Sequence, residues 1–462
     1  MRITRTDVLW NYVATFFKLA TSILLIPLIL REMSPETVGI WSVFMTISAF
    51  SSLLDFGFSS SFTRSVTYVF SGVKELKSKG FEEIKLEEHN KYINIDYSLL
   101  KGLIGAMRWF YLRISILLFL VLITIGTYYI SKLTLKYSGN QHEIYIAWFL
   151  LCLINCYNLY TLYYESLLTG RGLIKRSKQI IILGQITYLC IAATLIIMGK
   201  GLIAIIAAQA VSVVIIRILS FKSFFNKDIR DKLQKLSSRD YKKILSTIYP
   251  NAIKEGMTSF GGFMVQKSSI IIGSIFLSLQ DIASYGISMQ VINVISGLSM
   301  VYMVTYQPKI AHLRTIGDYY SIQKIYVKGQ LISFITYILF GIFMFLFGEI
   351  TLAKIGSLTQ LIGPSFLMLA LIISFIETNI TVAGIILLTK NEVPFYKASL
   401  ISGSIIILGL IISFNLYPPN LYLLFVVPLI VDIAYQGWKW PFEVFKDLRI
   451  KFYIPSIFLR NE

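Results

Sequence analysis

The chain has 462 residues, of which 55% are hydrophobic and 15% are charged, against roughly 25% charged residues in a soluble domain. This composition excludes an ordinary soluble protein and indicates an all-α polytopic membrane protein, since each membrane-spanning helix needs about 20 mostly apolar residues. A formal net charge of +18 is high enough that a nucleic-acid partner must be considered. The basic residues lie in short segments between apolar runs, however, so no nucleic-acid partner is expected.

The apolar runs predict about twelve transmembrane helices. The first run follows Arg2 and Arg5, and no small-residue cleavage site comes after it, so we interpret it as a retained span and not as a signal peptide. The predicted spans are 8–30, 37–60, 109–131, 144–168, 179–199, 201–219, 246–278, 281–306, 329–347, 361–389, 397–415 and 420–438.

The distribution of basic residues predicts the orientation. If the N-terminus is cytoplasmic, the outer loops hold only Arg31, Lys132, Lys136, Lys200 and Lys354, while the inner loops and the tail hold most of the remaining Lys and Arg. This is the bias of the positive-inside rule. It predicts an even number of spans with both termini in the cytoplasm, and the membrane lipids as the surroundings.

The loops divide the chain into four parts. We expect an N-terminal six-helix bundle at 1–219, with a solvated cytoplasmic segment at 72–108, and a C-terminal six-helix bundle at 246–440 before a cytoplasmic tail at 441–462. Between the bundles, residues 220–245 predict one amphipathic linker helix on the inner leaflet. Its apolar stripe comprises Phe221, Phe225, Ile229, Leu233 and Leu236. Residues 36–42 weakly resemble 281–287, which suggests a parallel repeat of the two bundles.

The residues of enzyme and metal sites are scarce. Cys152, Cys156 and Cys190 all lie in apolar runs, and the three histidines lie far apart in predicted loops. No phosphate-cradling Gly-rich lysine motif is present. We therefore expect no metal, no cofactor and no enzymatic activity.

Four charged residues lie near the centres of predicted spans: Lys18, Lys267, Glu377 and Asp432. Charges at bilayer depth are costly and usually mark a substrate or ion pathway. Glu377 and Asp432 are candidates for binding a coupling proton or sodium ion, since burial disfavours an ionised carboxylate. The alternative is that Lys267 pairs with one of these carboxylates for structural reasons.

One stretch carries the most specific signal in the chain. Pro27 to Ser42 (PLILREMSPETVGIWS) leads into Leu53 to Arg64 (LLDFGFSSSFTR). This resembles the opening of Wzx-type polysaccharide exporters, the O-antigen flippases of the multidrug/oligosaccharidyl-lipid/polysaccharide (MOP) exporter superfamily. Residues 165–172 and 283–287 are similar to that family less specifically.

The resemblance implies two MATE-like six-helix bundles around a central cavity, in the bacterial inner membrane. The implied cargo is an undecaprenyl-diphosphate-linked oligosaccharide, such as an O-antigen repeat, which is moved to the outer leaflet and used there by a polysaccharide polymerase and a chain-length regulator. In this fold Lys18 and Lys267 would border the cavity and contact the diphosphate. Asp55, Arg64, Arg171, Arg217 and Lys254 would form a cytoplasmic gate, with snorkelling helix-end charges as the alternative.

Two other functions remain as alternatives. A multidrug or cation antiporter of the same superfamily would prefer carboxylates in its cavity. A polysaccharide polymerase or ligase would be an enzyme with a large outer loop that carries catalytic arginines, but the longest predicted outer loop, 131–144, has none. Lipid II is a less expected cargo, because lipid II flippases have arginine-rich first helices and the first span here carries only Lys18.

Overall fold

The computed structural model describes residues 5–76, 95–315, 318–389 and 394–449. The described residues form helices and contain no strand, which confirms the all-α class. Within the described residues, ten helices are long and apolar enough to cross a membrane, or eleven if a bent pair is taken as one span. The protein is therefore a multi-pass membrane protein, with ten or eleven apolar spans in this part of the chain where the sequence predicts about twelve in all.

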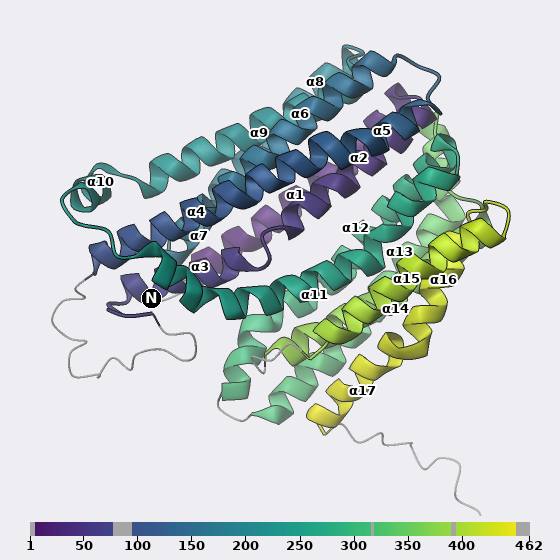
Figure 1. The fold of residues 1–462 in the computed structure, drawn as a ribbon. Helices are drawn as coiled ribbons and strands as arrows, with labels where there is room; N and C mark the ends of the chain where they lie inside the picture. Colours follow the sequence, from purple (N-terminus) through teal and green to yellow (C-terminus); the bar gives the residue numbers. More distant parts are fainter. Residues whose placement is uncertain (1–4, 77–94, 316–317, 390–393, 450–462) are drawn as a thin grey trace, which may run out of the picture. The chain divides into compact units, whose positions relative to one another are not determined.

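Figure 1 labels the helices in chain order. Two π-helical turns, η2 and η3, interrupt long helices. The elements are α1 (Arg5–Glu32), α2 (Pro35–Leu53), α3 (Phe58–Phe70), α4 (Tyr97–Val121), η2 (Leu122–Gly126), α5 (Thr127–Thr134), α6 (Gln141–Tyr160), α7 (Tyr163–Gly170), α8 (Ile174–Ile197), α9 (Gly201–Phe224), α10 (Lys227–Gln234), α11 (Tyr241–Phe276), α12 (Leu279–Thr315), α13 (Tyr319–Lys354), α14 (Pro364–Leu388), α15 (Tyr396–Leu416), α16 (Leu423–Val431), η3 (Asp432–Gln436) and α17 (Gly437–Asp447).

The predicted second and seventh spans differ most from the structure. The second is broken into α2 and α3, which are bent by 42°. The break follows from local backbone geometry, because Phe56 and Gly57 both have positive φ, at 47° and 70°. The predicted seventh span lies in α11, whose 36 residues are long enough to cross a bilayer but are not among the helices that are apolar enough.

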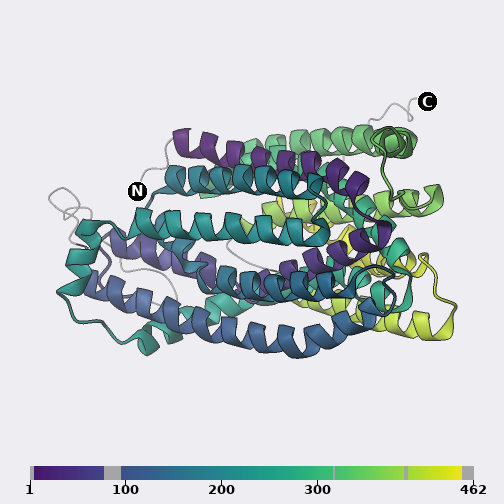
Figure 2. The same cartoon turned by 90° about the horizontal axis from the view of Figure 1, so that it is seen from above.

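The chain forms two compact units. Unit 1 comprises Met1–Gly286 and Thr351–Gln360, and unit 2 comprises Ile287–Ile350 and Leu361–Glu462. In unit 1, α1 lies along α8 and α8 along α9, as Figures 1 and 2 show, while α11 packs against α2, α3 and α4. The predicted six-helix bundles, 1–219 and 246–440, have other boundaries than these units and remain a prediction.

Close helix packing in unit 1 depends on small residues. A Cβ atom on Gly39 of α2 would lie 2.2 Å from the backbone oxygen of Leu279 at the start of α12. One on Gly256 of α11 would lie 2.6 Å from the Cα of Phe56, in the α2–α3 break. At both points only a glycine lets the backbones approach this closely.

Unit 2 has its core where α12, α13, α14 and α17 meet. Buried apolar side chains there include Met303, Ile310, Ile386 and Trp440. An ion pair closes one end of this core. The Arg314 Nη2 atom lies 2.7 Å from Asp447 Oδ2, with both side chains only 10% exposed, and Arg314 Nε also donates to the Thr389 hydroxyl at 2.8 Å.

The predicted linker is not a single helix. Helix α9 continues to Phe224, and Asn226 then caps the short helix α10 by accepting a hydrogen bond from the Ile229 amide at 3.1 Å. Phe225 and Ile229 of the apolar stripe are buried within the protein, and Phe221 packs against the ring of Tyr164. The first three residues of the stripe, Phe221, Phe225 and Ile229, therefore pack against other parts of the protein.

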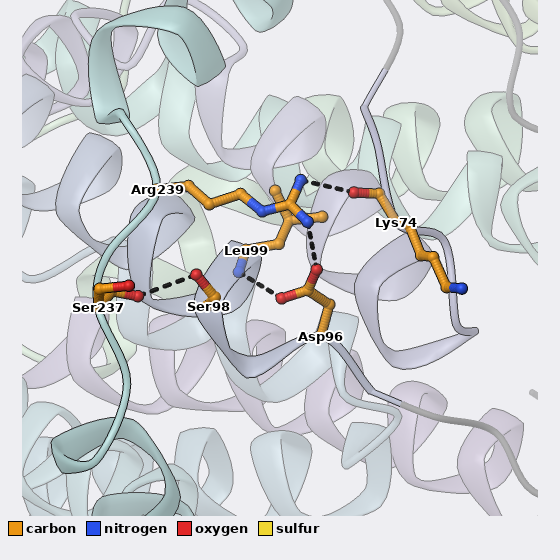
Figure 3. A network of polar contacts seen from close by, with 6 residues as sticks. All are labelled: Lys74, Asp96, Ser98, Leu99, Ser237 and Arg239. Atoms are coloured by element: carbon orange, nitrogen blue, oxygen red, sulfur yellow. Dashed lines mark hydrogen bonds and ion pairs between the residues drawn. The ribbon is translucent and has the colours of Figure 1, made fainter.

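The chain between α10 and α11 is fixed to the start of α4 (Figure 3). Arg239 donates to the Asp96 carboxylate at 2.5 Å and to the backbone oxygen of Lys74 at 2.8 Å. The Ser98 hydroxyl donates to the Ser237 backbone oxygen at 2.9 Å. Of the predicted segment 72–108, residues 97–108 belong to α4, and 77–94 lie outside the described residues. Residues 450–462 of the predicted tail also lie outside them.

The opposite end of α11 is held by a lysine of the predicted outer loop. The Lys136 ammonium donates to the backbone oxygens of Ser274, Ile275 and Leu277, at 3.2, 2.7 and 2.9 Å. A cation at this place satisfies the last carbonyls of the helix and complements its dipole. Partial burial lowers the pKa of Lys136.

Candidate functional site

A cluster of polar side chains in unit 1 surrounds the break between α2 and α3. Both carboxylate oxygens of Asp55 accept the Ser59 backbone N–H at 3.1 Å, which caps the start of α3. The Tyr111 hydroxyl of α4 donates to Asp55 Oδ1 at 2.5 Å, and the Tyr111 side chain is fully buried. The family-like motif therefore places its carboxylate at a helix joint, where it connects α3 to α4.

Arg217 of α9 brings a buried positive charge to the same cluster. Its side chain is only 5% exposed, and its Nη2 atom donates to the Asn158 Oδ1 atom of α6 at 2.6 Å. The Nε and Nη1 atoms have no hydrogen-bond partner in the described structure.

Other predicted gate residues lie around this cluster. Arg171 donates to the Phe224 backbone oxygen at 3.4 Å, and its guanidinium lies over the rings of Phe70 and Phe224. Arg64 donates to the Ser61 hydroxyl at 3.1 Å, one turn earlier on α3. The structure thus bonds Asp55 to Tyr111 at the α2–α3 break and buries Arg217 against Asn158, while Arg64 bonds Ser61 and Arg171 contacts Phe70 and Phe224. The side chain of Lys254 lies outside the described residues.

The four predicted intramembrane charges have different surroundings. Lys18 is exposed on α1, midway along an apolar helix, whereas Lys267 on α11 and Glu377 on α14 are partly buried. Asp432 is completely buried, and neither of its carboxylate oxygens has a hydrogen-bond partner in the described structure. It begins the π-helical turn η3, a type of turn that is frequent at functional sites.

Several residues of the cluster escape sequence reasoning. Tyr111 and Asn158 lie in apolar runs among many other tyrosines and asparagines, with no motif around them. Their partners come from distant helices, so only the fold shows which of them are paired. The described residues contain no group of three or more metal-ligand side chains.

Comparison with known proteins identifies structures of similar fold. No protein-family model and no curated protein sequence matches the chain. Among solved structures, a lipid II flippase MurJ in an inward closed conformation aligns with a TM-score of 0.61 and 16% identity over 96% of this chain and 89% of that chain. An inward-facing MATE-family multidrug resistance transporter of the MOP superfamily aligns with a TM-score of 0.58 and 14% identity, over 94% and 95% of the two chains. The fold is that of the MOP-superfamily transporters.

A further match of this fold is the MATE multidrug transporter DinF-BH, solved in complex with a ligand, with a TM-score of 0.58 and 14% identity, over 96% of this chain and 93% of that chain. These neighbours are transporters and a flippase. At such low identity the likeness concerns the fold alone, so the choice of cargo must be argued from the residues of this chain.

Proposed function

We propose that the protein is a flippase that carries undecaprenyl-diphosphate-linked oligosaccharide units, such as O-antigen repeats, from the inner to the outer leaflet of the bacterial inner membrane. It would work by alternating access, without cofactor or catalysis, and with both termini in the cytoplasm. The observation that carries the proposal is the combination of a MOP-superfamily fold with the Wzx-like stretch 27–64. The cargo would then pass to a polymerase and a chain-length regulator.

The chemistry of the cargo is the reason for assigning Lys18 and Lys267 to it. A sugar diphosphate lipid has an anionic, hydroxylated head that must leave water without losing its charge partners. An exposed ammonium midway along the apolar helix α1 is costly against lipid tails and favourable against a diphosphate. A lysine binds phosphate as a point charge, so Lys18 and Lys267 are the proposed contacts.

The proposed site for the coupling ion includes Glu377 and Asp432. An unpaired carboxylate in a fully buried position is strongly disfavoured as an anion, and Asp432 is in this situation. A side chain of this kind is suited to take up and release a cation, most simply a proton, as the protein changes conformation. Asp55, Arg64, Arg171, Arg217 and Lys254 are the proposed cytoplasmic gate.

The second candidate function is multidrug export. The observation that favours it is the alignment with MATE multidrug transporters at a TM-score of 0.58, close to the 0.61 of the flippase; one of these transporters was solved in complex with a ligand. A cationic drug would need carboxylates where a diphosphate needs lysines. Helix α1 carries Lys18 midway along its length, and α11 carries Lys267 in its second half, which supports the sugar-lipid cargo.

The test is surface-polysaccharide display in a deletion strain that is complemented with wild type, Lys18→Ala or, as a matched control on an exposed lysine outside the apolar centres, Lys222→Ala. We expect deletion to abolish surface glycan and to accumulate lipid-linked repeats inside the cell. Wild type and Lys222→Ala should restore display, and Lys18→Ala should not, at equal protein levels. Intact surface glycan combined with raised drug sensitivity in the deletion strain would replace this function by drug export.

A further inference from the structure

Two arginines from different helices lie beside the last turn of α9, in unit 1. Arg176 of α8 donates from its Nε atom to the Ser223 hydroxyl at 3.4 Å. The Arg230 guanidinium of α10 lies over the Phe221 ring, 5.4 Å from its centre, where the face of the ring attracts a cation. Both arginines are exposed. The fold thus brings two exposed guanidinium groups, far apart in the sequence, to one helix end.

An exposed lysine lies between these two contacts on the surface of α9. Lys222 is the helix residue between Phe221 and Ser223, and each of these neighbours is rotated from it by about 100°, in opposite directions. Three basic residues therefore follow one another around the end of α9: Arg176, Lys222 and Arg230. We refer to these three residues as the basic cluster.

The chain around the basic cluster is itself basic. Residues 171–178 contain four basic residues and no acidic one, and residues 222–235 contain five basic and two acidic residues. One of these two acidic residues, Asp228, pairs with Lys232 at 2.9 Å. The side chains of Lys222 and Arg230 make no hydrogen bond or ion pair within the described part of the chain. The protein therefore leaves this positive surface open to an anion from outside.

The basic cluster lies at the depth of lipid headgroups. Helix α9 has 24 residues, which extend over about 36 Å at 1.5 Å per residue, whereas the hydrocarbon core of a bilayer is about 30 Å thick. When α9 crosses the membrane, one end must therefore project beyond the hydrocarbon, and its charged end is the one that gains from doing so. Figure 1 shows α10, which carries Arg230, beyond this end of α9.

The exposed faces of α8 and α9 that lead to the basic cluster are apolar. On α9, Val214 and Ile218 are exposed and lie two turns and one turn before Lys222 on the same face. On α8, the exposed Leu183 lies two turns after Arg176 on the same face. The two helices pack along each other. Together they offer a surface for acyl chains that ends in positive charge.

Stabilisation of the helix end does not account for the basic cluster. The last carbonyls of a helix attract cations, and Arg171 has this role, because it donates to the Phe224 backbone oxygen at 3.4 Å. Arg176 bonds a side-chain hydroxyl instead, and Arg230 lies over an aromatic ring. A guanidinium has five N–H donors, so most donors of these two arginines are available to a ligand.

We infer that the basic cluster binds the phosphate headgroup of an anionic membrane phospholipid, whose acyl chains lie along the exposed faces of α8 and α9. Planar guanidinium groups match the geometry of phosphate oxygens, and basic surfaces at the ends of membrane helices attract anionic lipids. Such a lipid is a resident of the membrane and not the cargo. The inference therefore stands apart from the proposed function and holds for either candidate cargo.

Lipid binding by the purified, delipidated full chain tests the inference. Native mass spectrometry compares phosphatidylglycerol with phosphatidylcholine of the same acyl chains. We expect the wild type to bind phosphatidylglycerol about tenfold more tightly, and Arg176→Gln combined with Arg230→Gln to reduce this preference to about twofold. Arg31→Gln combined with Lys132→Gln removes two exposed charges from the last turns of α1 and α5. It is the matched control and should keep the preference.

Three results would overturn the inference: equal affinity of the wild type for the two lipids, an unchanged preference in the arginine variant, or an equal loss in the control. The last result would mean that net charge decides and not a site. Inorganic phosphate at the lipid concentration should leave phosphatidylglycerol bound, and displacement would show a free-anion site instead. If the double variant does not fold, Arg230→Gln alone replaces it and should lower the preference about threefold, because the Arg230 side chain has no hydrogen bond to lose.

Discussion

The hydrogen bond between Tyr111 and Asp55 should be a measurable part of the stability of unit 1. Tyr111→Phe removes only the hydroxyl, and the ring keeps its contacts with Phe62 and Tyr163. A hydrogen bond to a charged group contributes about 1.5–3 kcal/mol. Because the Ser59 amide still bonds the Asp55 carboxylate after the change, the acceptor is not stranded, and we expect the lower part of this range, about 2 kcal/mol.

The measurement is a double-mutant cycle on the purified protein, with Tyr111→Phe, Asp55→Asn and the double variant, followed by reversible unfolding in mixed micelles. About 2 kcal/mol corresponds to a roughly 30-fold change in the folding equilibrium. Tyr326→Phe, in the apolar core of unit 2, is the control and should change stability by less than about 0.5 kcal/mol. If the Tyr111 and Asp55 changes add to within about 0.5 kcal/mol, the two side chains are not coupled and the reasoning fails.

Three further predictions concern packing and buried charge. Gly39→Ala puts a methyl carbon 2.2 Å from a backbone oxygen and should lower the unfolding temperature clearly, whereas Gly262→Ala, which meets open space, should be neutral or stabilising by about 0.5–1 kcal/mol; equal effects would contradict the close approach. Arg314→Met leaves the Asp447 carboxylate buried without its partner and should cost about 3–5 kcal/mol of unfolding free energy, most of which Asp447→Leu should restore; no restoration would point to lost packing instead of a stranded charge. Lys136→Met removes three hydrogen bonds to the end of α11, so amide exchange in its last turn should accelerate about tenfold while its first turns stay unchanged; uniform exchange along α11 would argue against a local cap.

The sequence predicts the fold class of this chain because hydrophobic length is a local property. A run of about 20 apolar residues is visible without knowing what it packs against. Breaks within such runs are harder to predict. The α2–α3 break depends on the left-handed backbone of Phe56, a residue type that rarely adopts it, and on the close approach of Gly256 from α11. Neither the strain nor the neighbour can be read from the apolar pattern.

The candidate site shows the same division between local and distant information. Asp55 and Arg217 stand out in the sequence because they are charged residues beside or within apolar runs. Their partners do not stand out, since Tyr111 and Asn158 come from other helices and have ordinary neighbours in the chain. The apolar stripe of 220–245 shows the same limit: a stripe predicts that one face is covered, and for Phe221, Phe225 and Ile229 the covering surface is the protein itself, while Leu236 is exposed.

The geometry also explains what the family-like stretch 53–64 can tell about function. Asp55 caps α3 and binds Tyr111, Gly57 turns the backbone at the break, and Ser59 joins α3 to α7. Each of these residues thus has a structural role at the joint between helices, in addition to the family resemblance of the stretch. We expect the residues that contact the cargo to lie outside the joint. For an anionic sugar lipid these would be Lys18 and Lys267, which is why a substitution at Lys18 separates the two candidate functions more sharply than one at Asp55.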